Sequence, residues 1–598
     1  MKPFHETSEL RWKAMQRDIS KDSGGRTRLE EIQFSLDGRD NAPTNSCWEY
    51  LTIMLPQLVW TNPSLSVESR VPGMAQYDAL GLRYALESLM ETQRWNTIWE
   101  QVFTDALAWR GVTMVTSEDC AAPRYMDGLN LIDWEGKRRP VEAGEMLVSP
   151  RLVYIHPSDF FIDSDVRTTD AARRMGHKWK DSRNRLKRVA TEDDSYNLEA
   201  LRSFSGSSTT TDDDLITVHQ MYVPNYIDPD ALGSYDGDEK PGQDDLHFGT
   251  IYTMVENSGG GTDLRKPRVY RGPAMGPYQV YECVPEPGRR SRKAPLAAAW
   301  PQIDRDARFG EALIKSCESY KRNVLATEEV ADALYNDEMD GIVKVGLGGE
   351  LLQMAVKEIE IGGPSGQMVN AYGLSRDAVD KTLGMSDTQR GVATKGTTAT
   401  AESIADKSTG VKTALLRNSL QRAAERQIYV AAWQIMHSPD FIIALPDAAR
   451  QSGLEMMRDA GLPIGDELLK PQDGEVVIFT GGDSLKTGPR NAFDGLMVRI
   501  EAMSMERTSE ALQQKRVFES VEMIGKLLEM QQMFPDFDAK GAADDISGKL
   551  NMPGLGKHMP GTDAVAQQMA MQQQAAMQPA AGGPVGPQAG AMAAGGAL

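Results

Sequence analysis

The sequence has few cysteines and no long apolar segment, and both absences argue against whole classes of protein. Its four cysteines (Cys47, Cys120, Cys283 and Cys317) are far apart and form no CxxC pair, so neither a zinc module nor a disulfide framework is indicated. A reducing compartment is expected. No run of about 18 apolar residues occurs, so no transmembrane helix and no membrane partner are predicted. The first residues also lack the apolar region of a signal peptide.

The motifs of several enzyme classes are missing as well. The sequence contains no GxxxxGK[ST] loop, no GxSxG and no HExxH, so an ATP motor, a serine hydrolase elbow and a zinc protease are not indicated. The glycine-rich stretch 346–349 follows no βαβ pattern and is interpreted as a turn. The seven histidines are scattered without ligand spacing. No cofactor is predicted.

Length and charge limit the remaining possibilities. The chain has 598 residues, of which 40% are apolar and 25% are charged, which is enough for a sizeable core in a several-domain protein. Its net charge is −20. That charge argues against general nucleic-acid affinity, because such binders normally present a basic face. DNA that must slide past without sticking is compatible with an acidic wall.

The stretch from Gly384 to His437 is the most informative part of the chain. It begins as a loop rich in glycine and hydroxyl residues, which cannot bury itself in a core. It continues as a long helix that ends before Pro439. One face of that helix carries apolar residues at three- and four-residue steps: Leu416, Leu420, Ala424, Ile428, Ala431 and Ile435.

Other elements are expected before this stretch. The chain is predicted to form a peripheral arm over 1–40, a continuous helix over 76–108 and a basic helical region over 167–204. A turn is expected over 257–266. The predicted strands, of which the last two form an antiparallel unit, lie at 111–116, 152–155, 215–223 and 250–255.

The C-terminal half is predicted to be mostly helical. A helix over 304–335 is expected to bury Leu313, Cys317, Tyr320, Val324 and Leu325. A small β unit (341–345 with 358–361) and a short helix (377–383) are expected to follow it. Later in the chain we expect strands at 441–445 and 475–480 around a helix (447–460), then a long helix (492–533) and a low-complexity tail from 561. The predicted fold class is α+β with helix dominant.

Three clusters of polar residues suggest chemistry. Asp159, Asp163 and Asp165 could gather a hard cation, although Ser-Asp and Pro at a strand end are also ordinary turn residues. The acidic loop 228–239 imitates a calcium loop but has Leu232 where an oxygen is needed, so a solvated loop is favoured. A basic run could meet phosphate or an acidic partner, or be solvated; it consists of Arg289, Arg290, Arg292 and Lys293.

The order of these elements resembles the portal proteins of tailed bacteriophages. Four stretches carry the resemblance: Asn62–Val67 after an apolar helix; the turn His156–Asp163, similar to the family's Pro-x-Asp-hydrophobic-hydrophobic-x-Asp turn; the helix from Asp304 into a small β unit; and Gly384–Ser403, similar to the family's tunnel loop and helix start. The likeness spans roughly residues 45–535. The sequence departs from the family in having Ala401 before Glu402 and a short second stem helix.

The resemblance implies a portal-like division into wing, stem, clip and crown within a ring oligomer. The expected parts are an N-terminal arm (1–40), wing (41–303), stem helix (304–335), clip (336–370), second stem helix (371–384), tunnel loop (385–402), long helix with wing return (403–490), crown helices (491–560) and a disordered tail (561–598).

The resemblance also implies the partners and the place of work. The family forms a ring, commonly a dodecamer, at one capsid vertex of the virion after assembly in the host cytoplasm. Double-stranded DNA passes through without sequence specificity, and no reaction is catalysed. Partners of the family are the major capsid protein, scaffolding protein, terminase large subunit and head–tail adaptor. The residues expected to face DNA are Arg390, Thr394, Lys395, Thr397, Thr398 and Thr400.

Two other functions remain open from the sequence. One is a metal-dependent nuclease or hydrolase with an acidic site around Asp159, Asp163 and Asp165, which would require carboxylates that converge within a few ångströms. The other is a generic scaffold or adaptor.

Twelve portal subunits at −20 each would total −240, a charge suited to a conduit that does not bind DNA tightly.

Overall fold

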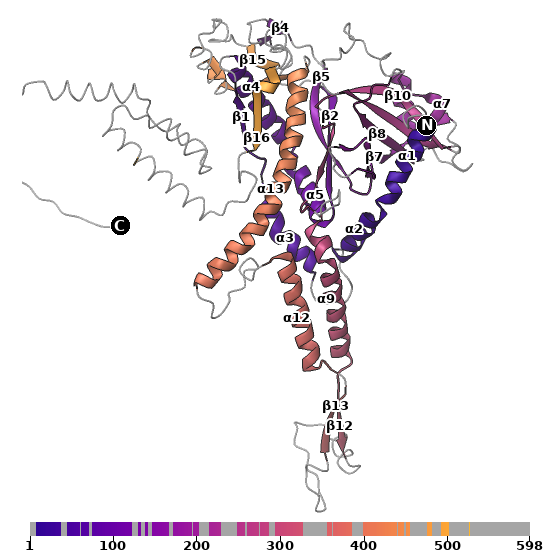
Figure 1. Ribbon diagram of the computed structural model, residues 1–598, viewed down its shortest axis with the longest axis vertical. Coiled ribbons are helices and arrows are strands. Elements are labelled where there is room, and N and C mark those ends of the chain that lie inside the picture. Colours follow the sequence, from indigo (N-terminus) through magenta and orange to yellow (C-terminus); the bar gives the residue numbers. More distant parts are fainter. Residues whose placement is uncertain are drawn as a thin grey trace, which may run out of the picture. The chain divides into compact units, whose positions relative to one another are not determined.

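The structure is a computed structural model of the chain, and it divides into two compact units, Met1–Arg507 and Thr508–Leu598. Nearly all described residues belong to the first unit (Figure 1). The described residues are 8–36, 45–59, 61–70, 74–121, 130–132, 138–140, 146–166, 171–193, 195–202, 215–228, 248–257, 260–273, 275–285, 293–326, 356–361, 363–385, 399–438, 441–447, 475–480 and 492–500, with single positions in 450–458 and at 526.

The first unit is a mixed α+β structure. Its helices are α1 (Ser8–Lys21), α2 (Ser23–Leu36), α3 (Ser46–Leu58), α4 (Met74–Thr92), α5 (Trp95–Ala108), α6 (Arg183–Glu192), α7 (Leu198–Arg202), α9 (Pro295–Glu318), α12 (Gly366–Leu383) and α13 (Ala399–His437), with the 3₁₀ turn η3 (Ala492–Gly495). No described helix is both long enough and apolar enough to cross a membrane.

Two antiparallel sheets make up most of the β structure. One has the order β10-β9-β8-β7-β6 and the other β11-β2-β5. Their strands are β2 (Gly111–Ala121), β5 (Met146–Ile155), β6 (Phe160–Ile162), β7 (Met175–Ser182), β8 (Leu215–Pro224), β9 (Phe248–Asn257), β10 (Gly260–Arg271) and β11 (Tyr278–Tyr281).

Smaller sheets join segments that are far apart in the sequence. The order β14-β15-β3-β4 includes one parallel pair, β15 with β3, and the strand β1 pairs with β16 near the end of the described chain. These strands are β1 (Leu65–Ser69), β3 (Asn130–Ile132), β4 (Arg138–Pro140), β14 (Ile442–Ala444), β15 (Glu475–Thr480) and β16 (Leu496–Ile500). The strands predicted around 111–116, 152–155, 215–223, 250–255, 441–445 and 475–480 are confirmed.

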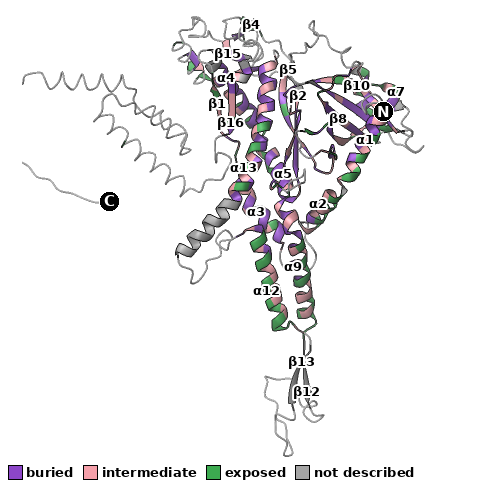
Figure 2. Cartoon of the chain, in the orientation of Figure 1, coloured by how far each residue is buried: buried purple, intermediate pink, exposed green. Residues whose placement is uncertain are grey.

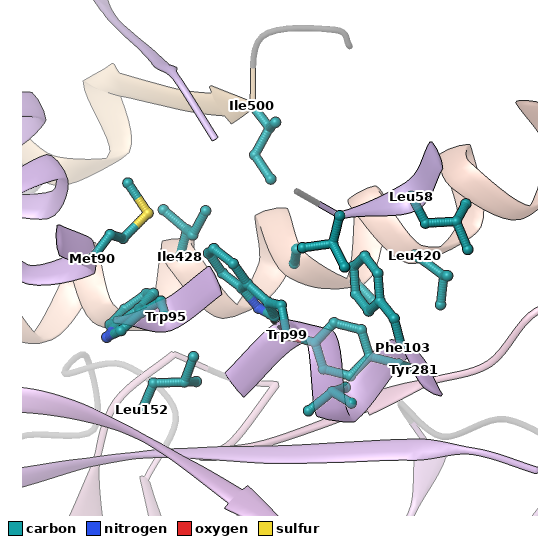
Figure 3. Close-up of a cluster of buried hydrophobic side chains, with 14 of the residues drawn as sticks. Leu58, Met90, Trp95, Trp99, Phe103, Leu152, Tyr281, Leu420, Ile428 and Ile500 are labelled. Carbon is teal, nitrogen blue, oxygen red and sulfur yellow. Dashed lines mark hydrogen bonds between the residues drawn. The ribbon is translucent and has the colours of Figure 1, made fainter. Parts of the chain in front are cut away.

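The largest apolar cluster surrounds helix α13 (Figure 3). All six residues of its predicted apolar stripe are buried. Trp95 and Trp99 of α5 meet edge to face with their ring centroids 5.6 Å apart. The indole N–H of Trp99 donates to the Tyr281 hydroxyl at 3.2 Å, so a polar atom deep in the cluster is satisfied. Gly111 allows β2 to approach α5, because a Cβ there would lie 2.2 Å from the Val102 carbonyl oxygen.

The single helix predicted over 76–108 is wrong, since two helices occupy that range. The chain breaks at Arg94, which adopts the left-handed conformation with φ 52°. Gln93 stabilises the break, because its side chain donates to the Pro150 carbonyl at 2.8 Å and accepts from the Trp95 indole at 2.9 Å.

Three other sequence predictions are corrected by long-range strand pairing. The basic region 167–204 is not a helix throughout, because β7, which pairs with β6 and β8, precedes α6 and α7 in it. The turn expected over 257–266 is largely strand β10, paired with β9. The helix expected over 492–533 begins instead as η3 and β16, since Leu496–Ile500 pair with β1. Residues beyond 500, including most of the predicted crown and all of the tail, lie outside the described part of the chain, apart from 526.

The predicted peripheral arm is packed against the rest of the unit. Met15 of α1 and Leu29 and Ile32 of α2 are almost completely buried. The two helices are separated at Asp22. Gly24 and Gly25 lie in the first turn of α2 and not between the helices. Charged residues dominate the sequence of this segment, so its apolar face is hard to recognise from the sequence.

Asp78, a buried residue near the start of α4, predicts a pH effect on stability. Burial raises its pKa to about 7. The contribution of this carboxyl to the free energy of unfolding is therefore fully present below the unfolded pKa near 4, where the group is neutral, and it is lost as the pH rises through about 7. We expect Asp78→Asn to match the parent at pH 4 and to exceed its unfolding free energy at pH 8 by on the order of 4 kcal/mol. Urea denaturation at both pH values measures this difference. Asp105, whose pKa burial also raises to about 7, titrates in both chains and cancels. Parallel pH profiles would refute the expectation.

Gln427 predicts a stabilising substitution within α13. Its side chain is fully buried, and neither amide atom has a hydrogen-bond partner among the residues that the structure describes. An unpaired buried amide costs roughly 1–3 kcal/mol. Gln427→Met keeps the volume and removes the polar atoms, so we expect the free energy of unfolding to rise by about 1–3 kcal/mol. The same substitution at Gln101, on the exposed face of α5, is the control and should change little. A loss of stability in Gln427→Met would contradict this account.

Candidate functional site: a helix pair, its hairpin and the long helix

Helices α9 and α12 lie side by side and are joined through a β-hairpin (Figure 1). Pro295 begins α9 at the position where its missing N–H costs nothing. Ser365 caps α12, since its hydroxyl accepts from the Met368 amide at 3.2 Å. Gly384 ends α12 in the left-handed conformation with φ 78°. Both helices therefore have well-defined ends.

The hairpin consists of β12 (Lys321–Ala326) and β13 (Val356–Ile361). Lys321 pairs with Ile361 and Ala326 with Val356, so the two strands leave the end of the helix pair together. The Ser316 hydroxyl of α9 donates to the Gly363 carbonyl at 2.7 Å, which ties the two arms at the base of the hairpin. The helix pair and the hairpin thus form one continuous element.

These boundaries correct the sequence predictions. The helix expected over 304–335 begins at Pro295 and ends at Glu318, and Cys317 and Tyr320 are exposed rather than buried. The helix expected over 377–383 begins at Gly366. The predicted strand 358–361 is present, but its partner is β12; the segment 341–345 lies outside the described residues.

Arg376 of α12 fastens the helix pair to the main core. Its guanidinium donates to the Ser46 hydroxyl at 2.6 Å and to the Glu49 carboxylate, both in the first turn of α3. It also lies 3.7 Å from the Asp306 carboxylate of α9. Burial raises the pKa of Asp306, and the Arg376 charge opposes that rise. One side chain therefore connects three helices.

The helix pair is buried only at the end near α3 (Figure 2). There Trp300 and Ile303 of α9 and Val379 and Leu383 of α12 join the main apolar cluster. Farther along, the two helices pack against each other, and Ser316 of α9 contacts Gly363 at the base of the hairpin. Large apolar side chains are exposed here: Phe309 (37%) on α9, Val369 (48%) and Leu374 (71%) on α12, and Tyr320 (43%) just beyond the end of α9. Such a set of exposed apolar residues is typical of a surface that another molecule covers.

Helix α13 follows the helix pair and runs through the main cluster. It has 39 residues, which corresponds to roughly 58 Å at 1.5 Å per residue. The described residues on either side of the predicted loop are the buried Met385 and Ala399 in the first turn of α13. Thr400 lies in that first turn. The other residues expected to face DNA lie outside the described part: Arg390, Thr394, Lys395, Thr397 and Thr398.

The predicted basic run lies at the start of α9. Lys293 is exposed, and its backbone exchanges two hydrogen bonds with Val284, at 2.7 and 3.2 Å. These bonds hold residues 284 and 293 side by side at the base of the helix pair. Arg289, Arg290 and Arg292 lie outside the described residues.

The acidic cluster does not form a metal site, because basic side chains already occupy its carboxylates. Asp163 is fully buried and pairs with Arg173 at 2.7 Å. Burial opposes its ionisation, but hydrogen bonds from Arg173 and the Asp165 amide and the charge of Arg174 hold its pKa below the ordinary value. Asp165 contacts Arg17 and Lys21, at 2.7 and 3.0 Å, and Asp159 lies 3.8 Å from Lys178.

No other metal-like cluster replaces it. Within the part of the chain that the structure describes, no three His, Cys, Asp or Glu side chains converge. His177 is held by the Tyr278 hydroxyl, with its Nδ1 2.9 Å away. Burial lowers the pKa values of His177 and His219 to about 4, with neighbouring cations or imidazoles as the lesser cause. Both imidazoles are therefore neutral near pH 7 and serve the packing of the sheet.

Two comparisons with known proteins found no match. No protein-family model matches the sequence, and no curated protein resembles it significantly.

The sequence reasoning missed Arg376 and the true starts of both helices of the pair. Two signals were available. Pro295 is a typical first helical residue, and Ser365 is a typical cap. Met368, Tyr372, Val379 and Leu383 recur at steps of four, seven and four residues, which places them on one helix face. The partners of Arg376 were not predictable, because Ser46 and Glu49 are more than 300 positions away.

We expect Arg376→Gln to loosen the attachment of the helix pair. It leaves the Glu49 and Asp306 carboxylates without their cation, so the free energy of unfolding should fall by about 1–3 kcal/mol. Arg308→Gln is the matched control, because Arg308 is 74% exposed in an i,i+4 pair with Asp304 at 2.8 Å; it should cost no more than about 0.5 kcal/mol. Equal effects in the two variants would show that Arg376 is not a structural connection. A double-mutant cycle with Glu49→Gln measures the coupling directly.

Proposed function

We propose that this chain is the portal subunit of a tailed bacteriophage and forms a ring around a channel for DNA. The observation that carries the proposal is the order α9, β12–β13, α12 and α13 within one chain. It is similar to the stem helix, clip, second stem helix and long helix of that family. The sequence resemblance had placed the stem with the wrong bounds, and the longer α12 brings the chain closer to the family pattern.

The exposed apolar residues on α9 and α12 support association with further copies. A helix pair that projects apolar side chains such as Leu374 into solvent is unfavourable in an isolated chain. In a closed ring, each copy would cover these residues on its neighbour through a heterologous contact. The ring proposal therefore supplies a partner for a surface that the chain itself leaves open.

The proposed channel would carry double-stranded DNA without reading its sequence. The net charge of −20 per chain favours an acidic conduit that repels phosphates. In this proposal the loop between Met385 and Ala399 faces the channel, where Lys395 and the threonines make weak phosphate contacts. The hairpin would dock the terminase large subunit and later the head–tail adaptor, and the outer sheets would meet the major capsid and scaffolding proteins of the virion.

The metal-dependent nuclease or hydrolase is not favoured by any observation. Its three carboxylates are each matched with Arg or Lys, and two divalent ions would have to displace those cations. A scaffold or adaptor role is compatible with the fold. It differs from the portal proposal in predicting no closed ring.

Imaging of the purified chain tests the proposal. We expect negative-stain images to show a ring with a central hole, and mass measurement to give an integral number of chains, commonly twelve in this family. A compact monomer under the same conditions would refute the proposal.

A charged substitution on α12 identifies the contact within the ring. Leu374→Asp should reduce the ring fraction about tenfold or more, because a carboxylate buried without a partner costs at least about 1.4 kcal/mol. Gln101→Asp on the exposed face of α5 is the control. Circular dichroism establishes that both variants are folded. An unchanged ring fraction in Leu374→Asp would mean that the helix pair is not the contact.

A further inference from the structure

Helix α1 covers an apolar area on one face of the five-stranded sheet. Trp12 and Met15 pack against side chains from β6, β8 and β9: Phe161, Met221, Val223, Tyr252 and Met254. The Trp12 ring meets His219 edge to face, with the centroids 4.9 Å apart. A Cβ on Gly261 would lie 2.5 Å from the indole, so the ring rests directly on the backbone of β10. The sheet face is therefore shaped for this helix.

Ion pairs surround the apolar contact. Arg11 binds Asp263 of β10 at 2.5 Å and lies over the Tyr252 ring. Asp18 receives two hydrogen bonds from Arg174, at 2.5 and 3.0 Å, and both side chains are buried. Arg17 and Lys21 share the carboxylate of Asp165 near the exposed side.

Helix α2 belongs to a different packing unit. Leu29 and Ile32 join the main cluster around α13, whereas Trp12 and Met15 join only the sheet cluster. The single residue Asp22 separates the two helices. Its carboxylate pairs with Arg110 at 2.6 Å, and this guanidinium also donates to the carbonyls of residues 157 and 160, at 3.2 and 3.1 Å. The junction is thus anchored independently of α1.

Among the described residues, the contact under α1 leaves some buried polar atoms without a partner, as the main core also does at Gln427. Within the described ranges, the buried Oδ1 of Asp263 and the Nδ1 of His219 have no hydrogen-bond partner. A buried ion pair such as Asp18–Arg174 adds little net stability, because desolvation offsets the Coulomb attraction. Polar groups left unpaired add a further cost. The interface therefore specifies where α1 lies more than it stabilises the helix there.

We infer that α1 can detach from the sheet as one unit, by rotation about Asp22, while α2 and the sheet stay folded. Release uncovers the apolar area together with the carboxylates of Asp165 and Asp263 at its edge. That uncovered surface binds an amphipathic helix with cations on either side of an apolar pair, which is the chemistry that α1 itself presents. The inference does not depend on the proposed ring.

Hydrogen exchange of the full chain, measured by mass spectrometry, tests the release. In Asp18→Asn, Arg174 loses its main counter-charge, so the amides of α1 should exchange about tenfold faster or more. Exchange in α2, β8 and β9 should remain as in the parent. Lys13→Gln is the control, since this lysine is 66% exposed and pairs with Glu9 on the same helix. Joint loss of protection in α1 and β8–β9, or equal effects of the two variants, would overturn the inference.

A milder variant covers the case in which Asp18→Asn does not fold. Arg17→Gln with Lys21→Gln removes only the partly exposed pairs to Asp165, and α1 alone should again exchange faster. Unchanged exchange, or exchange of α1 together with the sheet, would overturn the inference here too.

A synthetic peptide of residues 6–22, labelled at one end, tests the uncovered surface. It should bind whichever variant shows selective release, and the same peptide with Trp12→Ala should not bind. Absence of binding by the unaltered peptide would mean that the released face is not a helix-binding surface.

Discussion

The first unit depends on the burial of the apolar stripe of α13. Leu420, Ala424, Ile428 and Ala431 are completely buried, and the helix contacts α3, α4, β2, β11 and β16 along its length. Alanine at alternate turns lets neighbouring backbones approach closely, while the larger residues fill the spaces between them. Segments from residue 46 to residue 500 share this one helix. A change that tilts α13 would therefore disturb elements from both ends of the described chain.

Periodicity predicted the elements whose burial is one-sided, and it failed where a distant segment decides the structure. The stripe from Leu416 to Ile435 could be predicted because each residue faces the same cluster. Leu496–Ile500 continues a helical pattern in sequence, yet pairing with β1 makes it a strand. Arg94 gave no local sign that it would adopt φ 52°. Hydrogen bonds from Gln93 impose that conformation, and they require a strand more than 50 residues away.

The candidate sites show the same division. The long helix expected after the hydroxyl-rich loop is present, but it begins at Ala399, so Thr400, which was predicted to lie in the loop 385–402, is in its first turn. The acidic cluster was the least predictable feature, because composition cannot reveal that Arg173 and Arg174 fold back onto Asp163. Carboxylates spaced for a metal and carboxylates spaced for arginines look alike in sequence. Only the positions of the cations distinguish them.

The net charge of the chain determines which forces can hold the proposed ring together. Chains of −20 repel one another, so net electrostatics opposes their assembly. The helix pair itself is nearly balanced, with three cations and four acids on α9 and two of each on α12. Attraction between copies must therefore come from apolar contact along this element, at residues such as Phe309 and Leu374. At physiological ionic strength the Debye length of about 8 Å screens the distant acidic surfaces but leaves a close apolar contact intact. Added salt should accordingly favour the ring rather than dissociate it.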